Sequence, residues 1–198
     1  MARKTTISRE VILEAALKML IRDGYASVNV KTLASEIGCS TQPIVWHFEN
    51  MTGLRRALSE YAMAYAAKKA ASSYENKLES FELLGRSYVK MALKEPNLFK
   101  FLYLGESPMG KPYNLKDIGR AKNKEMIAMI AEQTGLNEEQ VIRFVRNTII
   151  YSHGIATMLA TGVLKGTEKE LMEMINKAAD AFILNEGADP EKIAVKGK

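Results

Sequence analysis

Apolar residues recur every three to four positions along most of this 198-residue chain. That spacing gathers them on one face of an α-helix, whereas a half-buried β-strand needs apolar and polar residues in alternation. Alternation of β-branched with polar residues rarely continues here for more than four positions. The sequence therefore predicts an all-α fold of about nine helices. They are expected at residues 9–23, 30–37, 41–48, 51–73, 76–94, 96–104, 115–134, 138–161 and 168–184.

Residues that favour helix ends mark several of these boundaries. A side-chain oxygen directly before a helix can accept a hydrogen bond from one of its unpaired first N–H groups. The expected N-caps of this kind are Ser8, Asn29, Ser40, Asn137 and Thr167. Gly24 and Gly38 follow the first two helices, where a left-handed residue ends the helix at little cost.

The composition excludes several classes of protein. Cys39 is the one cysteine, so a disulfide framework and a multi-thiolate zinc site are both excluded. The two histidines, His47 and His153, lie far apart in the sequence. We therefore expect no metal and no cofactor. No apolar run approaches the roughly 18 residues that span a bilayer, and no signal-peptide core follows the basic N-terminus. These features predict a cytoplasmic protein with no membrane partner.

The net charge is unevenly distributed. Of the formal charge of +5, +4 falls on residues 1–72 and +1 on residues 73–198. This asymmetry favours an N-terminal module that meets a polyanion, although mildly basic helix faces are common in proteins of other kinds.

Two short helices near the N-terminus form a recognisable pair. The helices expected at 30–37 and 41–48 have about two turns each and are joined through Gly38. Helices of that length are unstable alone, so the preceding helix must hold them. The arrangement is that of a helix-turn-helix unit, whose second helix can enter the major groove of DNA. Ile44 and Phe48, four positions apart, are expected to face inward. The positions left facing outward are Thr41, Gln42, Val45 and Trp46.

Residues 8–58 carry a more specific pattern than helical spacing. It consists of Gly24 and Tyr25, the run 28–38, the run 44–48, Asn50 and Leu54. This pattern, which has no internal gap, resembles the DNA-binding domain of the TetR family of transcriptional regulators. The resemblance implies a DNA-binding domain at 1–50 and a helical ligand-binding and dimerisation domain at 51–185. The polar segment 186–198 is expected to be a frayed tail.

The resemblance also implies how DNA is bound. A homodimer would place its two recognition helices in successive major grooves of a palindromic double-stranded operator. The residues expected to face base edges are Thr41, Gln42 and Trp46. Those expected near phosphates are Asn29, Lys31, Ser40, Pro43, Val45 and His47. Arg3 and Lys4 would form a flexible basic arm.

The sequence departs from the family pattern at three positions. Val45 stands where a tyrosine usually donates to a phosphate, Pro43 where a hydroxyl residue is frequent, and Met51 where a lysine usually begins the fourth helix. Loss of these phosphate contacts would weaken binding and flatten its salt dependence. Arg55 and Arg56 could compensate, although the family pattern does not assign them that role.

The rest of the chain contains candidates for an effector site and a dimer interface. Methionine and aromatic side chains give an adaptable apolar lining, but the same spacing is equally typical of plain core. The ligand candidates are Tyr88, Met91, Phe99, Phe101, Tyr103, Met126, Met129, His153 and Met158. His153 could instead be a hydrogen-bonded core histidine. The interface candidates, which could build a four-helix bundle, are Ile150, Gly154, Thr157, Thr161, Ala178, Ala179, Phe182 and Ile183.

The resemblance to the TetR family, together with these residues, implies a ligand-responsive transcriptional repressor that is released from its operator by a small, largely apolar effector. An effector that shifts the fourth helix would change the spacing of the two recognition helices. The alternative is a helical dimeric interaction protein that has lost specific DNA binding. An enzyme is not expected: residues 105–109 look like a Gly-x-Ser-x-Gly elbow, but Met109 replaces the second glycine and no strand precedes it.

Overall fold

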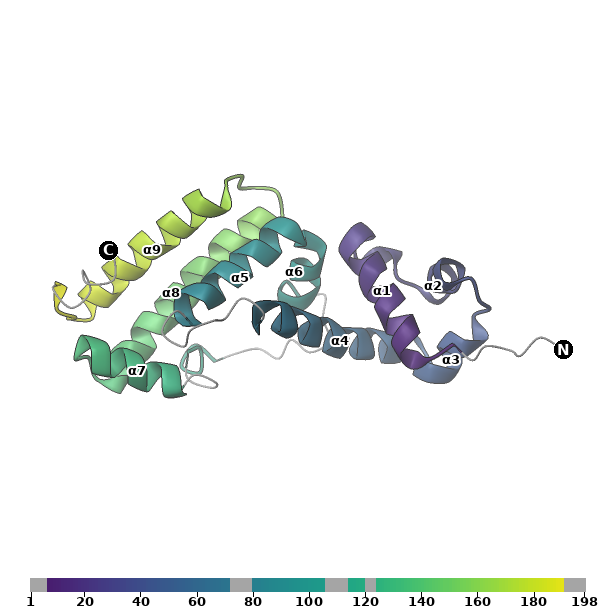
Figure 1. Cartoon of the computed structure of the whole chain (residues 1–198), viewed down its shortest axis with the longest axis horizontal. Coiled ribbons are helices and arrows are strands. Elements are labelled where there is room, and N and C mark those ends of the chain that lie inside the picture. The colour runs from purple at the N-terminus through teal and green to yellow at the C-terminus, as the bar shows by residue number, and fades with distance from the viewer. Residues whose placement is uncertain (1–6, 72–79, 106–113, 120–123, 191–198) are drawn as a thin grey trace. The chain divides into compact units, whose positions relative to one another are not determined.

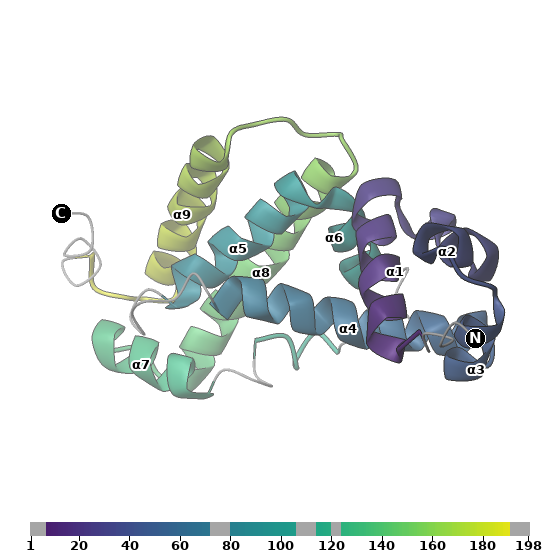
Figure 2. The same cartoon turned by 45° about the vertical axis from the view of Figure 1, so that its right-hand side comes forward.

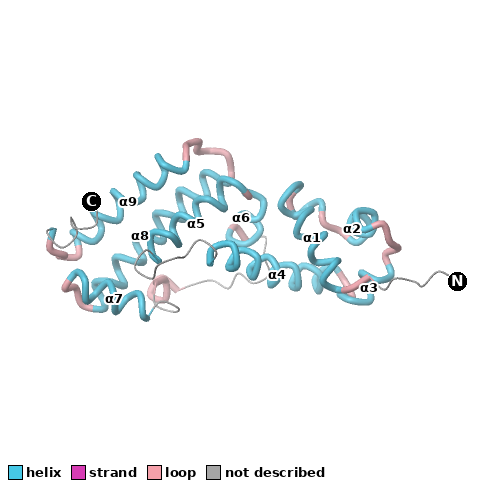
Figure 3. The backbone as a smooth tube through the Cα atoms, in the orientation of Figure 1, coloured by secondary structure: helices cyan, strands magenta, loops and turns pink. Residues whose placement is uncertain are grey.

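The computed structural model describes residues 7–71, 80–105, 114–119 and 124–190, and every regular element in them is a helix (Figures 1 and 3). The elements are α1 (Arg9–Asp23), the 3-10 helix η1 (Tyr25–Ser27), α2 (Val30–Ile37), α3 (Gln42–Phe48), α4 (Met51–Ala71), α5 (Ser80–Lys94), α6 (Pro96–Tyr103), α7 (Lys124–Thr134), α8 (Glu138–Ala160) and α9 (Glu168–Asn185). The predicted all-α class is confirmed. Among the residues that the structure describes, no helix is both long enough and apolar enough to cross a membrane.

The chain divides into two compact units. The first contains residues 1–72 and 94–110, and the second contains residues 73–93 and 111–198. This division differs from the expected boundary at residue 50, because α4 and α6 pack with the N-terminal helices. We call these parts the N-terminal unit and the C-terminal unit.

In the N-terminal unit, α1 is the central helix. It packs against α2, α3, α4 and α6, and Figure 2 shows it lying across α4. The α1 residues buried by this packing are Ile12, Leu13, Ala16, Leu17, Met19 and Leu20. Because α1 presents apolar side chains to several neighbours, it holds the short helices that could not persist alone.

In the C-terminal unit, α9 packs along α8, and α7 packs on the N-terminal half of α8. The core at that end of α8 is formed by Ile127, Ile130, Leu136, Val141, Ile142, Phe144, Val145, Ile183 and Ala188. Ala188 is 5% exposed, the Arg143 guanidinium lies 2.7 Å from the Glu186 carboxylate, and Gln140 donates to the Glu186 carbonyl at 2.6 Å. The expected frayed tail is therefore wrong for residues 186–190, and residues 191–198 lie outside the described part.

Most of the expected caps are confirmed. Ser8 accepts from the Val11 N–H, and each of the other three N-cap side chains forms a reciprocal capping box with the residue three positions later. The pairs are Asn29 with Thr32, Asn137 with Gln140, and Thr167 with Glu170. The expected Ser40 cap is wrong, because α3 begins after Thr41 and no side chain caps it.

The expected helix at 115–134 is also corrected. Residues 115–119 form turns, residues 120–123 lie outside the described part, and α7 begins at Lys124. Gly119 has a φ of 91°, and a Cβ built on it would lie 3.4 Å from the Arg146 amide nitrogen and the Ile142 carbonyl oxygen of α8. A left-handed residue in such close contact cannot continue a right-handed helix.

One glycine is required by the approach of α3 to α4. A Cβ on Gly53 would lie only 2.2 Å from the Phe48 carbonyl oxygen at the end of α3. We therefore expect Gly53→Ala to lower the free energy of unfolding of the N-terminal unit by about 1–3 kcal/mol, because backbone must shift to relieve the clash. Urea unfolding followed by far-UV circular dichroism, which reports on the helices of both units, would measure the change in the free energy of unfolding.

The matched control is Gly85→Ala in α5, where an added Cβ meets nothing within 4 Å. Alanine there should stabilise by roughly 0.5–1 kcal/mol, because the chain loses less backbone entropy on folding. If both substitutions were neutral or stabilising, the close approach of α3 to Gly53 would be contradicted.

Candidate nucleic-acid interface

The turn between α2 and α3 is built by Gly38. This residue has a φ of 76° and ψ of 36°, and its N–H and that of Cys39 donate to the Ser35 and Ala34 carbonyls. These bonds satisfy the last carbonyls of α2, while the left-handed conformation turns the chain sharply toward α3. The geometry is that of a helix-turn-helix unit.

The two sides of α3 differ in burial, as the sequence predicted. Ile44 and Phe48 are 1% and 5% exposed and fix the helix to the domain. On the other side Trp46, the single tryptophan of the chain, is 75% exposed, and Val45 is 45% exposed. Gln42 is exposed as well. A large aromatic ring left in solvent has little value for folding, so the outer side of α3 is a candidate contact surface.

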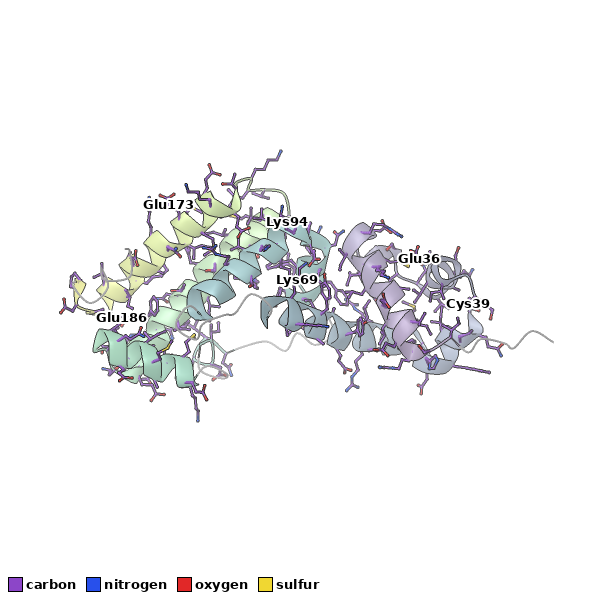
Figure 4. All side chains as sticks on the ribbon, viewed as in Figure 1. Glu36, Cys39, Lys69, Lys94, Glu173 and Glu186 are labelled. Atoms are coloured by element: carbon purple, nitrogen blue, oxygen red, sulfur yellow. The ribbon has the colours of Figure 1, made fainter. Side chains whose placement is uncertain are left out.

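An ion pair fixes α2 to α1. Two guanidinium nitrogens of Arg22, in the last turn of α1, donate to the two Glu36 carboxylate oxygens of α2 at 3.2 and 3.1 Å (Figure 4 labels Glu36). The hydrogen bonds and positive charge of Arg22 lower the pKa of the Glu36 carboxyl. Planar two-bond pairing fixes direction as well as distance, so α2 is oriented on α1.

His47 is attached to the N-terminal segment. Its Nε2 lies 3.0 Å from the Ile7 carbonyl oxygen. A carbonyl only accepts, so Nε2 carries the hydrogen and donates it. This bond ties the outer side of α3 to the point where the expected basic arm begins. Arg3 and Lys4 themselves lie outside the described residues.

The other expected DNA-contacting residues lie on or beside the helix-turn-helix unit. The Asn29 side chain accepts from the N–H groups of Lys31 and Thr32 at the start of α2, the kind of helix end that favours anions. Lys31, Ser40 and Thr41 are exposed, and Pro43 is half-buried in the first turn of α3.

The Arg55 side chain packs on an aromatic ring of the same unit. Its guanidinium carbon lies 4.8 Å from the centre of the Tyr25 ring, and its Nε is buried with no hydrogen-bond partner among the described residues. Arg56 is exposed and lies 3.6 Å from Glu60. Of the two arginines expected to compensate for lost phosphate contacts, Arg55 is half-buried and Arg56 is exposed.

The ligand candidates fall in different units. Phe99 and Phe101 are fully buried in the N-terminal unit, and Tyr103 contacts the Phe99 ring. The candidates in the C-terminal unit are Tyr88, Met91, Met126, Met129, His153 and Met158. There the Tyr88 hydroxyl lies 2.5 Å from His153 Nδ1, and burial lowers the pKa of His153. His153 therefore links α5 to α8 by a hydrogen bond.

The interface candidates differ in exposure. Ile150 and Gly154 on α8 are exposed, and so is Thr161, the residue after the end of α8. Thr157 on α8 is half-buried, as are Ala178, Ala179 and Phe182 on α9. Ile183 instead belongs to the core at the end of α8. Three further exposed apolar side chains were not among the interface candidates. They do not follow the three-to-four-residue spacing of the buried residues, from which the apolar faces were predicted. They are Ile149 on α8 and Met174 and Leu184 on α9.

Comparison with known proteins agrees with the geometry. The family model described as bacterial regulatory proteins, tetR family, matches residues 12–58. An uncharacterised HTH-type transcriptional regulator from Mycobacterium tuberculosis is 37% identical over 57 residues, which are 29% of this chain and 26% of the relative. This chain thus matches about a quarter of the length of that relative.

The fold is shared over a larger part of the chain. The crystal structure of TetR from Acinetobacter baumannii matches with a TM-score of 0.59 and covers 90% of this chain and 96% of that one, at 16% identity. Residues 12–58 are therefore similar to bacterial regulatory proteins of the tetR family, and most of the chain shares the fold of that solved structure.

The cap at the start of α2 has a testable energetic role. We expect Asn29→Ala to lower the free energy of unfolding by about 0.5–2 kcal/mol, because two N–H groups of α2 lose their acceptor. Ser40→Ala, at the cap position that the structure does not use, should change it by less than about 0.5 kcal/mol. Denaturant unfolding of both variants without DNA would measure the difference, and equal losses would contradict the assignment of the caps.

Proposed function

We propose that this protein is a transcriptional regulator that binds double-stranded DNA with the outer side of α3. The observation that carries the proposal is the two-sided character of this helix. Ile44 and Phe48 hold its back, while Gln42 and Trp46 stand in solvent. A helix held in this way can enter a major groove without losing its own packing.

The base-reading residues in this proposal are Thr41, Gln42 and Trp46. The Gln42 amide can donate and accept at once, which suits the N6 and N7 groups of adenine, and the Trp46 ring can pack on a sugar or a thymine methyl group. The residues proposed to lie near phosphates are Asn29, Lys31, Ser40, Pro43, Val45 and His47, with Arg3 and Lys4 as the arm. Val45 and Pro43 can offer only packing there, because neither side chain has a donor.

A palindromic operator is read by two copies of the protein whose recognition helices are held at a fixed spacing. We propose a homodimer formed by the exposed apolar faces of α8 and α9, which include Ile150, Met158, Met174 and Leu184. Gly154 allows a partner helix to approach closely, and a stable interface would bury about 1,200–2,000 Å² or more. The half-sites would then lie about 34 Å, or a multiple of it, apart.

We propose a small, largely apolar effector for the C-terminal unit, near Tyr88, Met91 and His153. Such an effector releases DNA only if it binds the non-operator state more tightly. A 100-fold loss of operator affinity requires about 2.7 kcal/mol of coupling. Release on binding would make the protein a repressor.

The exposed Val45 favours one other function. Where the family has a phosphate donor, this helix has an apolar side chain, and an apolar outer side would also suit a helical dimeric protein that binds another protein. The two functions are distinguished by passing genomic DNA fragments over the purified protein and sequencing the fragments that it retains. Recovery of a common palindromic sequence supports the regulator, and uniform weak retention of all fragments supports the interaction protein.

The base-reading role is tested by Gln42→Ala and Trp46→Ala. With a retained genomic fragment as probe, each variant should lose about 10–100-fold in the ratio of specific to non-specific binding, because each removes a contact to base edges. Fluorescence anisotropy of labelled DNA at two salt concentrations would measure this. Met63→Ala, which removes an exposed apolar side chain from α4, is the control and should bind as the wild type does. Unchanged footprints of the two α3 variants would contradict the assignment.

The proposed interface is tested by Gly154→Arg. A charged side chain on a face that packs against its own copy should yield monomers in sedimentation, because two desolvated charges meet at the symmetry axis. Ala128→Arg, at an exposed position of α7, should leave the dimer intact. A dimer that persists in the Gly154 variant would place the interface elsewhere.

A further inference from the structure

The outer side of α3 carries no lysine or arginine. Neither residue type occurs anywhere in residues 32–54, a stretch that contains the whole of α3. The exposed residues of α3 are Gln42, Val45, Trp46 and His47. This surface therefore offers an amide, an imidazole and apolar groups to a partner, and it offers no long cationic side chain.

Two of the polar side chains beside this surface are engaged within the protein. His47 donates its Nε2 hydrogen to the Ile7 carbonyl at 3.0 Å. The Asn50 side chain, just after α3, accepts from the Gly53 N–H at 3.0 Å. The side-chain amide of Gln42, in contrast, has no hydrogen-bond partner among the residues that the structure describes. Gln42 is thus an amide with both its donor and its acceptor open to a base.

Gln42 and Trp46 lie along the centre of the outer side. Each lies two positions before a buried anchor, Ile44 and Phe48 respectively, and a two-residue step turns an α-helix by about 200°. The two side chains therefore point almost directly away from the domain. They lie one turn apart, with a rise of about 6 Å between them, and Val45 lies about a quarter of a turn to one side.

The chemistry of these two side chains distinguishes between base pairs. In the major groove, guanine presents the acceptors O6 and N7, and arginine or lysine is the side chain that commonly pairs with both. The outer side of α3 has neither. The Gln42 amide instead matches the N6 donor and N7 acceptor of adenine, and the exposed Trp46 ring matches the C5 methyl group of thymine, an apolar group that cytosine lacks.

We propose that the base pairs beneath α3 are read as A·T pairs, in which Gln42 binds an adenine and Trp46 packs on a thymine C5 methyl group. This inference rests on the proposed function, because it specifies the DNA that α3 binds. Base pairs along a duplex are about 3.4 Å apart, so a rise of about 6 Å places the two contacts within about two base-pair steps. Each half-site should therefore contain A·T pairs at that spacing.

Uracil substitution tests the methyl contact, since uracil pairs as thymine does but lacks the C5 methyl group. The probe is the palindromic sequence recovered from genomic DNA, with one thymine of one half-site changed to uracil at a time. At one position the change should weaken binding about fourfold, the effect of removing one carbon from an apolar contact. Thymines outside the footprint are the control and should tolerate uracil. If no thymine in the half-site were sensitive, the proposal would be wrong.

A double-mutant cycle assigns the sensitive methyl group to a side chain. Trp46→Ala should bind the thymine and uracil probes equally, because the ring that contacts the methyl group is absent. Val45→Ala, to one side of the contact line, is the matched control and should keep the preference of about fourfold for thymine. Anisotropy at low salt, where weakened binding is still measurable, gives the four affinities. A preference kept by Trp46→Ala, or lost in Val45→Ala, would overturn the assignment.

The adenine contact is tested with 7-deazaadenine, which lacks the N7 acceptor. One such substitution should weaken binding of the wild type about tenfold and leave Gln42→Ala unaffected, because the amide that meets N7 is then absent. Equal losses in both proteins would contradict the Gln42 contact.

The recovered sequence separates failure of this inference from failure of the proposed function. If the purified protein retained no common sequence, the proposed function would fail and this inference with it. If the common sequence had only G·C pairs as its essential pairs beneath α3, the protein would still be a DNA-binding regulator, and the reading of A·T pairs by Gln42 and Trp46 would be wrong.

Discussion

The burial of one side of α3 is the constraint on which the rest of the N-terminal unit depends. A seven-residue helix has too few internal hydrogen bonds to persist in water, so Ile44 and Phe48 must supply its stability through packing. Once these two side chains are fixed, helical geometry places Gln42, Val45 and Trp46 on the opposite side. The exposed surface proposed to read DNA is thus a direct consequence of where the core lies.

The packing of α1 explains why this unit is larger than the helix-turn-helix alone. α1 contacts α2 and α3 on one part of its surface and α4 and α6 on another. α6 therefore contacts the same helix that supports α2 and α3. Asn97 and Phe101, both on α6, place a segment that is distant in sequence directly against the end of α1 and η1.

The similarity to known proteins also differs between the N-terminal helices and the rest of the chain. The family model matches residues 12–58 and the curated relative matches 57 residues, whereas the structural match covers 90% of the chain at 16% identity. A DNA-binding module restricts its residues strongly, because the turn, the buried anchors and the caps must all fit one geometry. A helical body tolerates many apolar combinations of equal volume, so its sequence diverges while the fold is kept.

The sequence by itself determined the helical class, most helix bounds, the caps at Asn29, Asn137 and Thr167, and the two sides of α3. These features depend on residues within a few positions of one another, so spacing alone identifies them. Only the tertiary structure decided that Arg55 lies on Tyr25 and that α6 packs with the N-terminal helices. It also decided that Gly53 must lack a side chain and that residues 186–190 pack in the C-terminal unit. Each of these depends on a contact outside its own helix, most of them between residues far apart in the chain, which no local pattern records.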